Sequence, residues 1–268
     1  MPKVLRVLSV LNPESQELDE IDTFSLEIQT LLAALTGKPS RHTLEHTASA
    51  LGKIGAPAID PLLASLKDAN RRVRNNAAWA LGKFKDPRVV EALIAALKNP
   101  DSGLRNHAAS ALGKIKNSEA VESLIEALKD PDPDVRYTVA EALGNTSDTR
   151  AVSALLAAFR QRDTSVVVGA HRFFIKKGIR GSEDVLIEAL NNTDYQIDMV
   201  ESFLNCRNSK LEKAARELAG KWPNARITPS LAPEYPVWGS GSRRKDMAPI
   251  QPALPRGRSE RFPSASVS

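Results

Sequence analysis

The sequence has a single cysteine, Cys206, and few aromatic residues, which make up only 5% of its 268 residues. One cysteine cannot form a disulfide within the chain, so a disulfide framework is excluded and the cytoplasm is the expected compartment. Because aromatics are scarce, the core must be built from Ala, Leu, Ile and Val, which suit close helix packing. No apolar run approaches the roughly 20 residues of a membrane-spanning helix, so no membrane segment is expected.

The net charge of +5 is concentrated at one end of the chain. Residues 222–268 contain seven Lys and Arg against three Asp and Glu, a balance of +4, which leaves about +1 for the first 221 residues. Because residues 1–221 are close to neutral, a dedicated nucleic-acid groove in this part of the chain is not expected. Residues 222–268 also hold eight of the 17 prolines and seven serines, so they are predicted to form a Pro/Ser-rich basic disordered tail.

A short motif recurs at a nearly fixed spacing between residues 50 and 145. Ala-Leu-Gly-Lys occurs three times, and Ala-Leu-Gly-Asn follows as a fourth copy. The leucines of these copies are spaced by 30, 31 and 31 residues, at Leu51, Leu81, Leu112 and Leu143. Self-similarity at this period is typical of a stacked array of repeats, in which each unit buries its apolar faces against its neighbours.

Each unit is predicted to contain two helices. In the second unit, Val73, Ala77, Leu81 and Phe84 lie on one helical face, and Asp86 followed by proline is typical of the start of a second helix. The repeated glycines near the end of each first helix predict close helix approach or a cap. Ile175 stands where the fifth glycine is due, so the fifth unit must pack differently.

These patterns divide the chain into four parts. We predict an N-terminal helical cap over 1–39, repeats of about 31 residues over 40–181, a C-terminal helical cap over 182–221, and the tail. Helical periodicity without the repeat motif defines the two caps, the first of which includes a helical pattern over 14–36. The predicted fold is an all-α, right-handed α-solenoid.

The repeated pattern also carries a family resemblance. Val73-Arg-Asn-Asn-Ala-Ala-Trp-Ala-Leu-Gly-Lys83 and its copy from Leu104 to Lys114 resemble the HEAT-like repeats of the phycobilisome-lyase type. The resemblance covers roughly residues 40–180 and implies the fold. That repeat class occurs in bilin lyase subunits, in deoxyhypusine hydroxylase and in adaptors, so fold-level analogy does not choose a function.

The enzymatic members of the class make different demands on the sequence. Deoxyhypusine hydroxylase carries His-Glu pairs that build a di-iron site, and none of the four histidines here is followed by Glu. The segment from Ala77 to Phe84 resembles a stretch of the E-type bilin lyase subunit, which implies a concave face cradling a tetrapyrrole. No catalytic residue, cofactor or metal ligand is assigned, and Cys206 is interpreted as a buried thiol rather than a nucleophile.

Charged side chains recur in register on the second helices. Acids mark their N-terminal ends, at Asp60, Glu91 and Glu122, and lysines mark their C-terminal ends, at Lys67, Lys98 and Lys129. Helix dipoles favour this distribution, and stacking also turns it into stripes that a partner can bind. A third ladder, Arg74, Arg105 and Arg136, is predicted to pair with acids in neighbouring loops such as Asp101 and Asp132, and so to tie the repeats together.

Three aromatic residues are candidate contacts for a partner. Trp79 occupies a position where the other units have Ser, Glu or Arg, about 140° from the apolar face at 100° per residue; it is either a binding anchor or a side chain folded against the next repeat. Tyr235 and Trp238 lie in a Tyr-Pro-Val-Trp sequence in the tail, which is either a docking motif or part of an unstructured extension.

The sequence therefore predicts a scaffold or adaptor that binds a protein partner on its solenoid surface, with the face lined by the second helices as the expected contact. The alternative is a bilin-lyase-like subunit or another enzyme of the repeat class. Neither a metal nor a membrane partner is expected, and nucleic acid is disfavoured by the near-neutral array.

Overall fold

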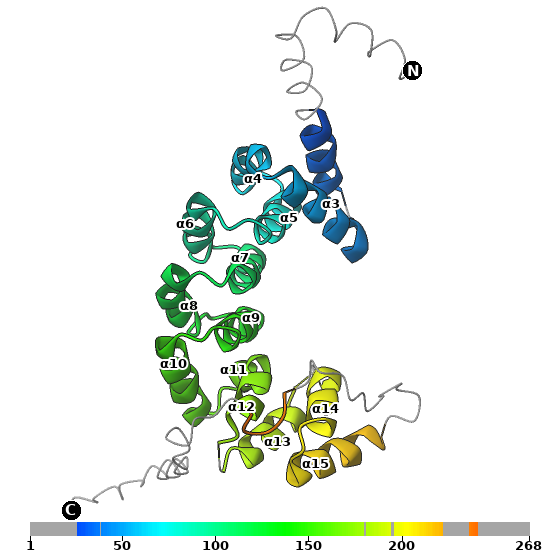
Figure 1. The fold of residues 1–268 in the computed structure, drawn as a ribbon, viewed down its shortest axis with the longest axis vertical. Helices are drawn as coiled ribbons and strands as arrows, with labels where there is room; N and C mark the ends of the chain where they lie inside the picture. The colour runs from blue at the N-terminus through cyan, green and yellow to red at the C-terminus, as the bar shows by residue number, and fades with distance from the viewer. Residues whose placement is uncertain (1–25, 38, 180, 194–195, 222–235, 241–268) are drawn as a thin grey trace, which may run out of the picture.

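The computed structural model describes residues 26–37, 39–179, 181–193, 196–221 and 236–240. They form a curved all-α solenoid in which the chain alternates between two rows of helices (Figure 1). The all-α solenoid of two-helix repeats predicted from the sequence is confirmed.

The first helix of each unit belongs to an inner row and the second helix to an outer row (Figure 1). The inner row contains α3 (Arg41–Ile54), α5 (Arg71–Leu81), α7 (Ser102–Ile115), α9 (Pro133–Gly144), α11 (Thr164–Gly169) and α12 (His171–Lys177). The outer row contains α4 (Ile59–Ser65), α6 (Pro87–Ala96), α8 (Val121–Ala127) and α10 (Thr149–Arg160). Short 3-10 turns, η1 (Ala56–Ala58) and η2 (Ser118–Ala120), precede α4 and α8.

Aspartate or asparagine side chains begin most helices of the array. Asp86 accepts a hydrogen bond from the backbone N–H of Arg88 at 2.8 Å, with Pro87 in the first turn of α6, as the sequence predicted. Asp101 caps α7 and Asp132 caps α9 in the same way. These caps satisfy N–H groups that have no partner within the helix, so each loop sets where the next helix starts.

Close approach between inner helices depends on the repeated glycines. A Cβ atom added at Gly113 would lie 2.7 Å from the Cβ of Ala142 and 3.0 Å from its Cα. The same addition at Gly82 would lie 3.0 Å from the Cα of Ala111. The glycines therefore act at a helix–helix contact, where the absence of a side chain lets α5, α7 and α9 pack against one another.

The inner helices pack more closely against their neighbours than the outer helices do. The buried face of the inner row is rich in alanine, including Ala77, Ala78, Ala108 and Ala109, whereas the outer helices bury larger residues such as Leu93 and Leu124. Because one row is shorter than the other, the array bends with its inner row on the concave side (Figure 1).

An arginine ladder connects successive units, as the sequence predicted. Each arginine forms an ion pair in the loop that leads to the following unit: Arg74 with Asp101 at 3.2 Å, Arg105 with Asp130 at 2.7 Å, and Arg136 with Asp163 at 3.1 Å. The partner of Arg105 differs from the expected Asp132, because this loop carries a second carboxylate, Asp130, where the preceding loop has Asn99. The guanidinium of Arg105 also donates to the carbonyls of Asn99 and Pro100.

The ends of the array depart from the repeat. In the fifth unit the inner helix is broken at Ala170 into α11 and α12, and Ile175 is fully buried where the other units have glycine. The chain then turns through α13 (Glu183–Asn191), α14 (Gln196–Leu204) and α15 (Ser209–Ala219), which lie across one end of the concavity (Figure 1). At the other end, residues 26–36 form a helix that buries Ile28 and Leu35; residues 14–25 of the predicted cap lie outside the described residues.

Candidate functional site

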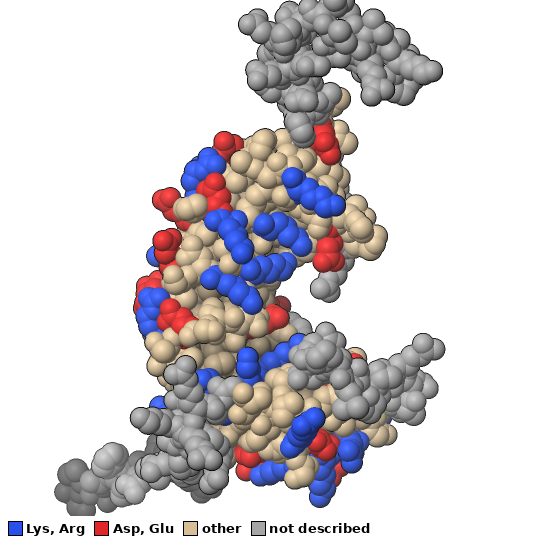
Figure 2. Space-filling view, viewed as in Figure 1, with Lys and Arg blue, Asp and Glu red and all other residues tan. Residues whose placement is uncertain are grey.

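The charged ladders of the second helices lie on the outer row. Their acids and bases take part in exposed ion pairs between units: Asp60 with Arg88 at 2.8 Å, Glu122 with Arg150 at 3.7 Å, and Lys98 with Glu126 at 3.9 Å. Acids and bases alternate along this outer edge (Figure 2). Exposed pairs of this kind contribute little to stability, so the outer row presents a mixed, solvated surface.

Two of the predicted contact residues meet at a groove between α4 and α6. Lys67 and Glu91 lie at its edge, and its floor includes Leu63, Leu66 and Ala95. The cavity measures about 530 Å³. Glu122 and Lys129 belong to the next unit, at α8, and do not line the groove, so the structure brings together only part of the predicted outer site.

Trp79 lies on the inner row, near the C-terminal end of α5. Its side chain is half-buried and packs against the core. The ammonium of Lys114 lies 4.3 Å from the centroid of its rings, and that of Lys83 lies 5.8 Å away. Both proposed roles of Trp79 therefore have a physical basis, because the indole packs against the core and also lies close to two cations at the surface.

Lys83 and Lys114 belong to a longer row that sequence reasoning did not select. The residue after each repeated glycine is Lys53, Lys83, Lys114, Asn145 and, at the equivalent place in α12, Lys176. All five are exposed. We call the four lysines the inner lysine row. Lys and Arg side chains gather over this part of the array (Figure 2).

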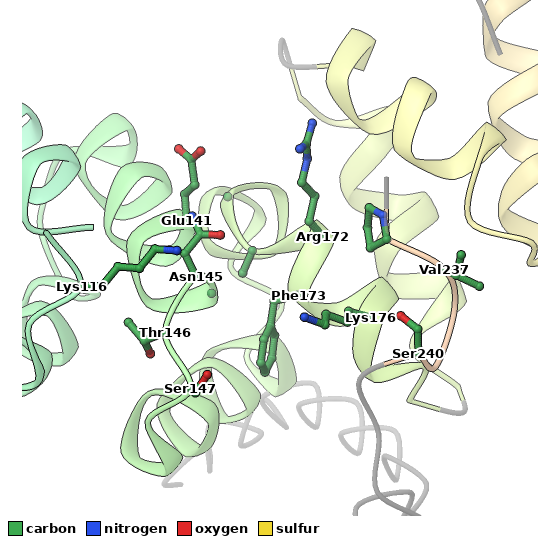
Figure 3. Close-up of a pocket in the computed structure, with 14 residues that line it drawn as sticks. Lys116, Glu141, Asn145, Thr146, Ser147, Arg172, Phe173, Lys176, Val237 and Ser240 are labelled. Atoms are coloured by element: carbon green, nitrogen blue, oxygen red, sulfur yellow. The ribbon is translucent and has the colours of Figure 1, made fainter. Parts of the chain in front are cut away.

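The inner lysine row leads into a cavity of about 620 Å³ at the end of the repeats (Figure 3). Lys116 and Lys176 approach it from opposite sides, while Glu141 of α9 and Arg172 of α12 project on the same side (Figure 3). Phe173 forms part of the floor. A smaller cavity lined by Lys114, Lys116 and Glu141 adjoins it, so the two form one depression along α7, α9 and α12.

A short piece of the predicted tail forms one wall of this cavity. Residues 236–240, which we call the docked segment, contribute Pro236, Val237 and Ser240 to the lining. The backbone N–H of Trp238 donates to the carbonyl of Cys206 at 2.7 Å, and that of Gly239 donates to the carbonyl of Ile175 at 2.9 Å. The docked segment therefore lies against α12 and the turn after α14 (Figure 1).

A glycine pair makes this contact possible. A Cβ added at Gly178, whose φ is +60°, would lie within 2.4 Å of the Cα of Gly239. Trp238 packs against the core of the array and is half-buried. Tyr235 lies outside the described residues, as does the rest of the predicted tail.

The comparisons with known proteins decide the family. A family model for HEAT repeats matches residues 28–112 and 90–171, which together span more than half of the chain. The chain belongs to the HEAT-repeat family. The resemblance to HEAT-like repeats indicated by the sequence is thus confirmed.

Solved structures similar to this HEAT-repeat protein include the complex of CpcE and CpcF of phycocyanin lyase from Nostoc sp. PCC7120, with 23% identity over 50% of this chain and 89% of that chain and a TM-score of 0.44. A designed armadillo repeat protein shows 18% identity over 70% and 96% of the two chains, with a TM-score of 0.36. Human deoxyhypusine hydroxylase in complex with glycerol shows 15% identity over 78% and 98%, with a TM-score of 0.36. None of the curated proteins matches the sequence.

The electrostatics of the HEAT-repeat depression are dominated by cations. Partial desolvation raises the pKa of Glu141, and the nearby charge of Asp198 raises it further, while Arg172 and Lys114 act in the opposite direction. Arg172 pairs with Asp198 at 2.8 Å. Glu141 is the one carboxylate among the equivalent positions Ser49, Trp79, Ser110, Glu141 and Arg172.

The histidines of α3 and α7 contact groups on their own helices. His42 and His46 are exposed neighbours on α3, with their Nε2 atoms 3.0 Å apart. The Nδ1 atom of His107 lies 2.7 Å from the carbonyl oxygen of Gly103. Within the described ranges no group of three His, Cys, Asp or Glu residues lies close enough to hold a metal ion.

Burial explains the chemistry of Cys206 and His171. Cys206 is buried, as predicted, and desolvation raises the pKa of its thiol to about 11, which keeps it protonated at neutral pH. His171 is also buried, with one ring nitrogen 2.6 Å from the carbonyl oxygen of Val168 and the other 3.0 Å from the hydroxyl of Ser202.

None of the helices that the structure describes is long and apolar enough to cross a membrane.

The inner lysine row had a signal in the sequence, since the repeated Ala-Leu-Gly-Lys motif contains it. The motif identifies the helix end on which each lysine lies, but it does not indicate which row of helices is concave. The sequence predicted that the second helices line the contact face. The inner lysine row is a second candidate surface, and it lies on the first helices.

Proposed function

We propose that this HEAT-repeat protein is a scaffold that binds a protein partner on the inner surface of its solenoid. The observation that supports this most directly is the half-buried Trp79, whose ring centroid lies 5.8 Å from the ammonium group of Lys83 and 4.3 Å from that of Lys114. Tryptophan is among the residues that contribute most to protein–protein affinity, particularly in a well-packed position surrounded by residues that exclude water.

The position of Trp79 within its unit adds to this argument. The equivalent residues Ser49, Ser110, Glu141 and Arg172 are polar, so a tryptophan is not required for the repeat to stack. Its half-buried indole packs against the core and contacts the two cations, which limits its motion and so lowers the entropy lost when a partner binds. The single buried cysteine suits the cytoplasmic location expected from the composition.

Affinity capture of the full chain followed by mass spectrometry tests the proposal. Three variants cover the three candidate surfaces: Trp79→Ala on the inner row, Glu91→Lys at the outer groove, and Trp238→Ala in the docked segment. We expect one partner that is retained by the last two variants and lost by Trp79→Ala, with unchanged circular dichroism. A partner retained equally by all three variants, or no partner above background, contradicts the proposal.

The bilin-lyase-like alternative has a separate readout. Co-expression with a bilin and an acceptor protein, followed by absorbance spectroscopy of the purified chain, detects a bound tetrapyrrole directly. Visible absorbance that co-purifies with the chain and disappears on Trp79→Ala supports that alternative instead of a scaffold. Co-purified protein without visible absorbance supports the scaffold.

A further inference from the structure

The inner lysine row has a regular geometry that selects a class of partner. The ring centroid of Trp79 lies 5.8 Å from one ammonium and 4.3 Å from the other, so the ammonium groups of Lys83 and Lys114 lie at most about 10 Å apart. One lysine occurs per unit, and packed helices are spaced by about 8–10 Å. The backbone positions from which the lysines extend are therefore expected to repeat at about one helix spacing.

This spacing matches one extended peptide conformation better than another. A polyproline-II segment rises about 3.1 Å per residue with three residues per turn, so every third side chain points the same way at intervals of about 9.3 Å. A β-strand presents the same face at every second residue, at intervals of about 6.6–6.8 Å, or at every fourth, at about 13 Å. Carboxylates at every third residue of a polyproline-II segment fit the row.

The lysines also have a structural explanation, which involves no partner. Lys53 and Lys114 lie in the last turns of α3 and α7, where the helix dipole favours a cation. The outer lysines Lys67, Lys98 and Lys129 follow the same rule in the same three units. The outer lysines, however, alternate with the acids of the outer ladder, and Lys98 lies 3.9 Å from Glu126.

Acidic residues are fewer at the inner positions. The five positions of the lysine row and the five positions equivalent to Trp79 contain one carboxylate, Glu141, and five cations, of which Arg172 pairs with Asp198 of α14. Lys116 adds a further cation at the depression where the row ends. The surplus of positive charge is thus local to the inner surface, because the first 221 residues together carry only about +1.

An acidic protein segment suits this surface better than a nucleic acid does. A nucleic-acid groove draws on a broad field from many Lys and Arg residues, whereas here a narrow row of lysines crosses an otherwise near-neutral array. Trp79 also supplies an apolar contact between two charges, which suits a peptide with a small or apolar residue between its acids.

We propose that the inner lysine row and Trp79 bind an extended acidic segment of a partner protein, with carboxylates at every third residue. This rests on the proposed function and specifies the chemistry of its partner. The segment runs across α3, α5 and α7 and reaches the depression between Lys116 and Lys176. Each carboxylate pairs with one lysine, and the residues between them contact the indole.

Synthetic peptides test the spacing. A fluorescein-labelled peptide of about 12 residues, Asp-Pro-Ser repeated, spans about 37 Å at 3.1 Å per residue. Two controls keep its length: one has the same composition with its aspartates adjacent, and one has Asn in place of Asp. Fluorescence anisotropy with the full chain is measured at about 50 mM and about 200 mM salt, because surface attraction weakens as the Debye length shrinks.

Matched triple variants test the surface. Lys53, Lys83 and Lys114 are replaced by Gln in one protein, and Lys67, Lys98 and Lys129 are replaced by Gln in the other. Both lose three charges from helix C-terminal ends in the same three units. At about 0.2–1 kcal/mol for each exposed ion pair, the inner variant should bind the spaced peptide about tenfold more weakly, and the outer variant should change its affinity less than about threefold.

Several outcomes overturn the proposal. Equal losses in the two triple variants would show attraction to charge in general, and equal binding of the spaced and clustered peptides would show that the row does not select the spacing. A single-stranded oligonucleotide of similar length that binds more tightly than the spaced peptide, and is lost in the inner variant, would make the row a nucleic-acid surface. Peptide binding is measured without a cellular partner. A failure of the capture experiment, which tests the proposed function, can therefore be told apart from a failure of peptide binding, which tests the acidic segment.

Discussion

Gly113 and Gly52 occupy the same position in two repeats, yet an added methyl group should have opposite effects at the two. Replacing glycine by alanine inside a helix gains about 1 kcal/mol of helix propensity. At Gly113 the new Cβ would lie 2.7 Å from the Cβ of Ala142 and 3.0 Å from its Cα. Overpacking of this kind costs about 1–3 kcal/mol, so Gly113→Ala should destabilise the array by about 1 kcal/mol.

At Gly52 the nearest atom is the Cβ of Lys83, at 3.3 Å. Lys83 follows the end of α5, where a shift of a few tenths of an ångström is cheap, so most of the propensity gain should remain. Gly52→Ala should therefore stabilise the array by about 0.5 kcal/mol. The two substitutions are chemically identical and differ only in what faces the new methyl group.

Urea denaturation followed by circular dichroism measures the difference. With a slope of about 2 kcal/mol per molar urea, the midpoint should fall by about 0.5 M for Gly113→Ala and rise by about 0.2 M for Gly52→Ala. Repeat arrays can unfold in parts, so amide exchange of α7 and α9 should report the same order. If Gly113→Ala stabilised the protein as Gly52→Ala does, close packing of α7 on α9 would not be the reason for the repeated glycine.

Three further perturbations follow from buried or strained groups. Burial lowers the pKa of His171, so the unfolded chain takes up a proton at a higher pH than the folded chain does. The stability that neutral His171 contributes is complete above about pH 6.5 and declines as the pH falls toward its folded-state pKa. His171→Asn should therefore flatten that part of a stability–pH curve. Asp130→Asn leaves the nearly buried Arg105 without its carboxylate and should cost about 2 kcal/mol in denaturant unfolding, below the 3–5 kcal/mol of a fully buried pair because water reaches the loop; an unchanged midpoint would contradict this. Gly178→Ala should release the docked segment and so speed its cleavage by a protease, whereas Gly55→Ala, which also has a positive φ but meets nothing within 4 Å, should leave that cleavage unchanged.

Most of the fold could be predicted from the sequence because the same two-helix pattern recurs in four units. The period, the two helices of each unit and the cap at Asp86 all follow from local patterns that the structure retains. Ile175 indicated that the fifth unit packs differently, but the break of its inner helix at Ala170 was not predicted. Next to the break, a Cβ added at Gly169 would clash with the backbone of Tyr137, a close approach that no residue pattern indicates.

The candidate site was less predictable than the fold. Curvature is the sum of small differences in packing between the two rows, so the sequence pattern of one unit does not reveal which row is concave. The docking of the 236–240 segment depends on main-chain hydrogen bonds from Trp238 and Gly239, which leave no pattern of residue types. The lysines were visible in the repeated motif, but their shared surface exists only after the units have stacked.

The arginine ladder has a consequence for how such an array can change in length. Between α5 and α9 the same contacts recur in each unit: an inner glycine against the next helix, and an arginine paired in the following loop. Duplicating one 31-residue unit in this stretch would reproduce the same kinds of contact at both junctions and would add one lysine to the inner row. Duplication across Ala170 would instead separate the broken helix from the cap that it supports. The length of the concave surface can therefore grow by insertion in the middle of the array, while its C-terminal boundary stays fixed.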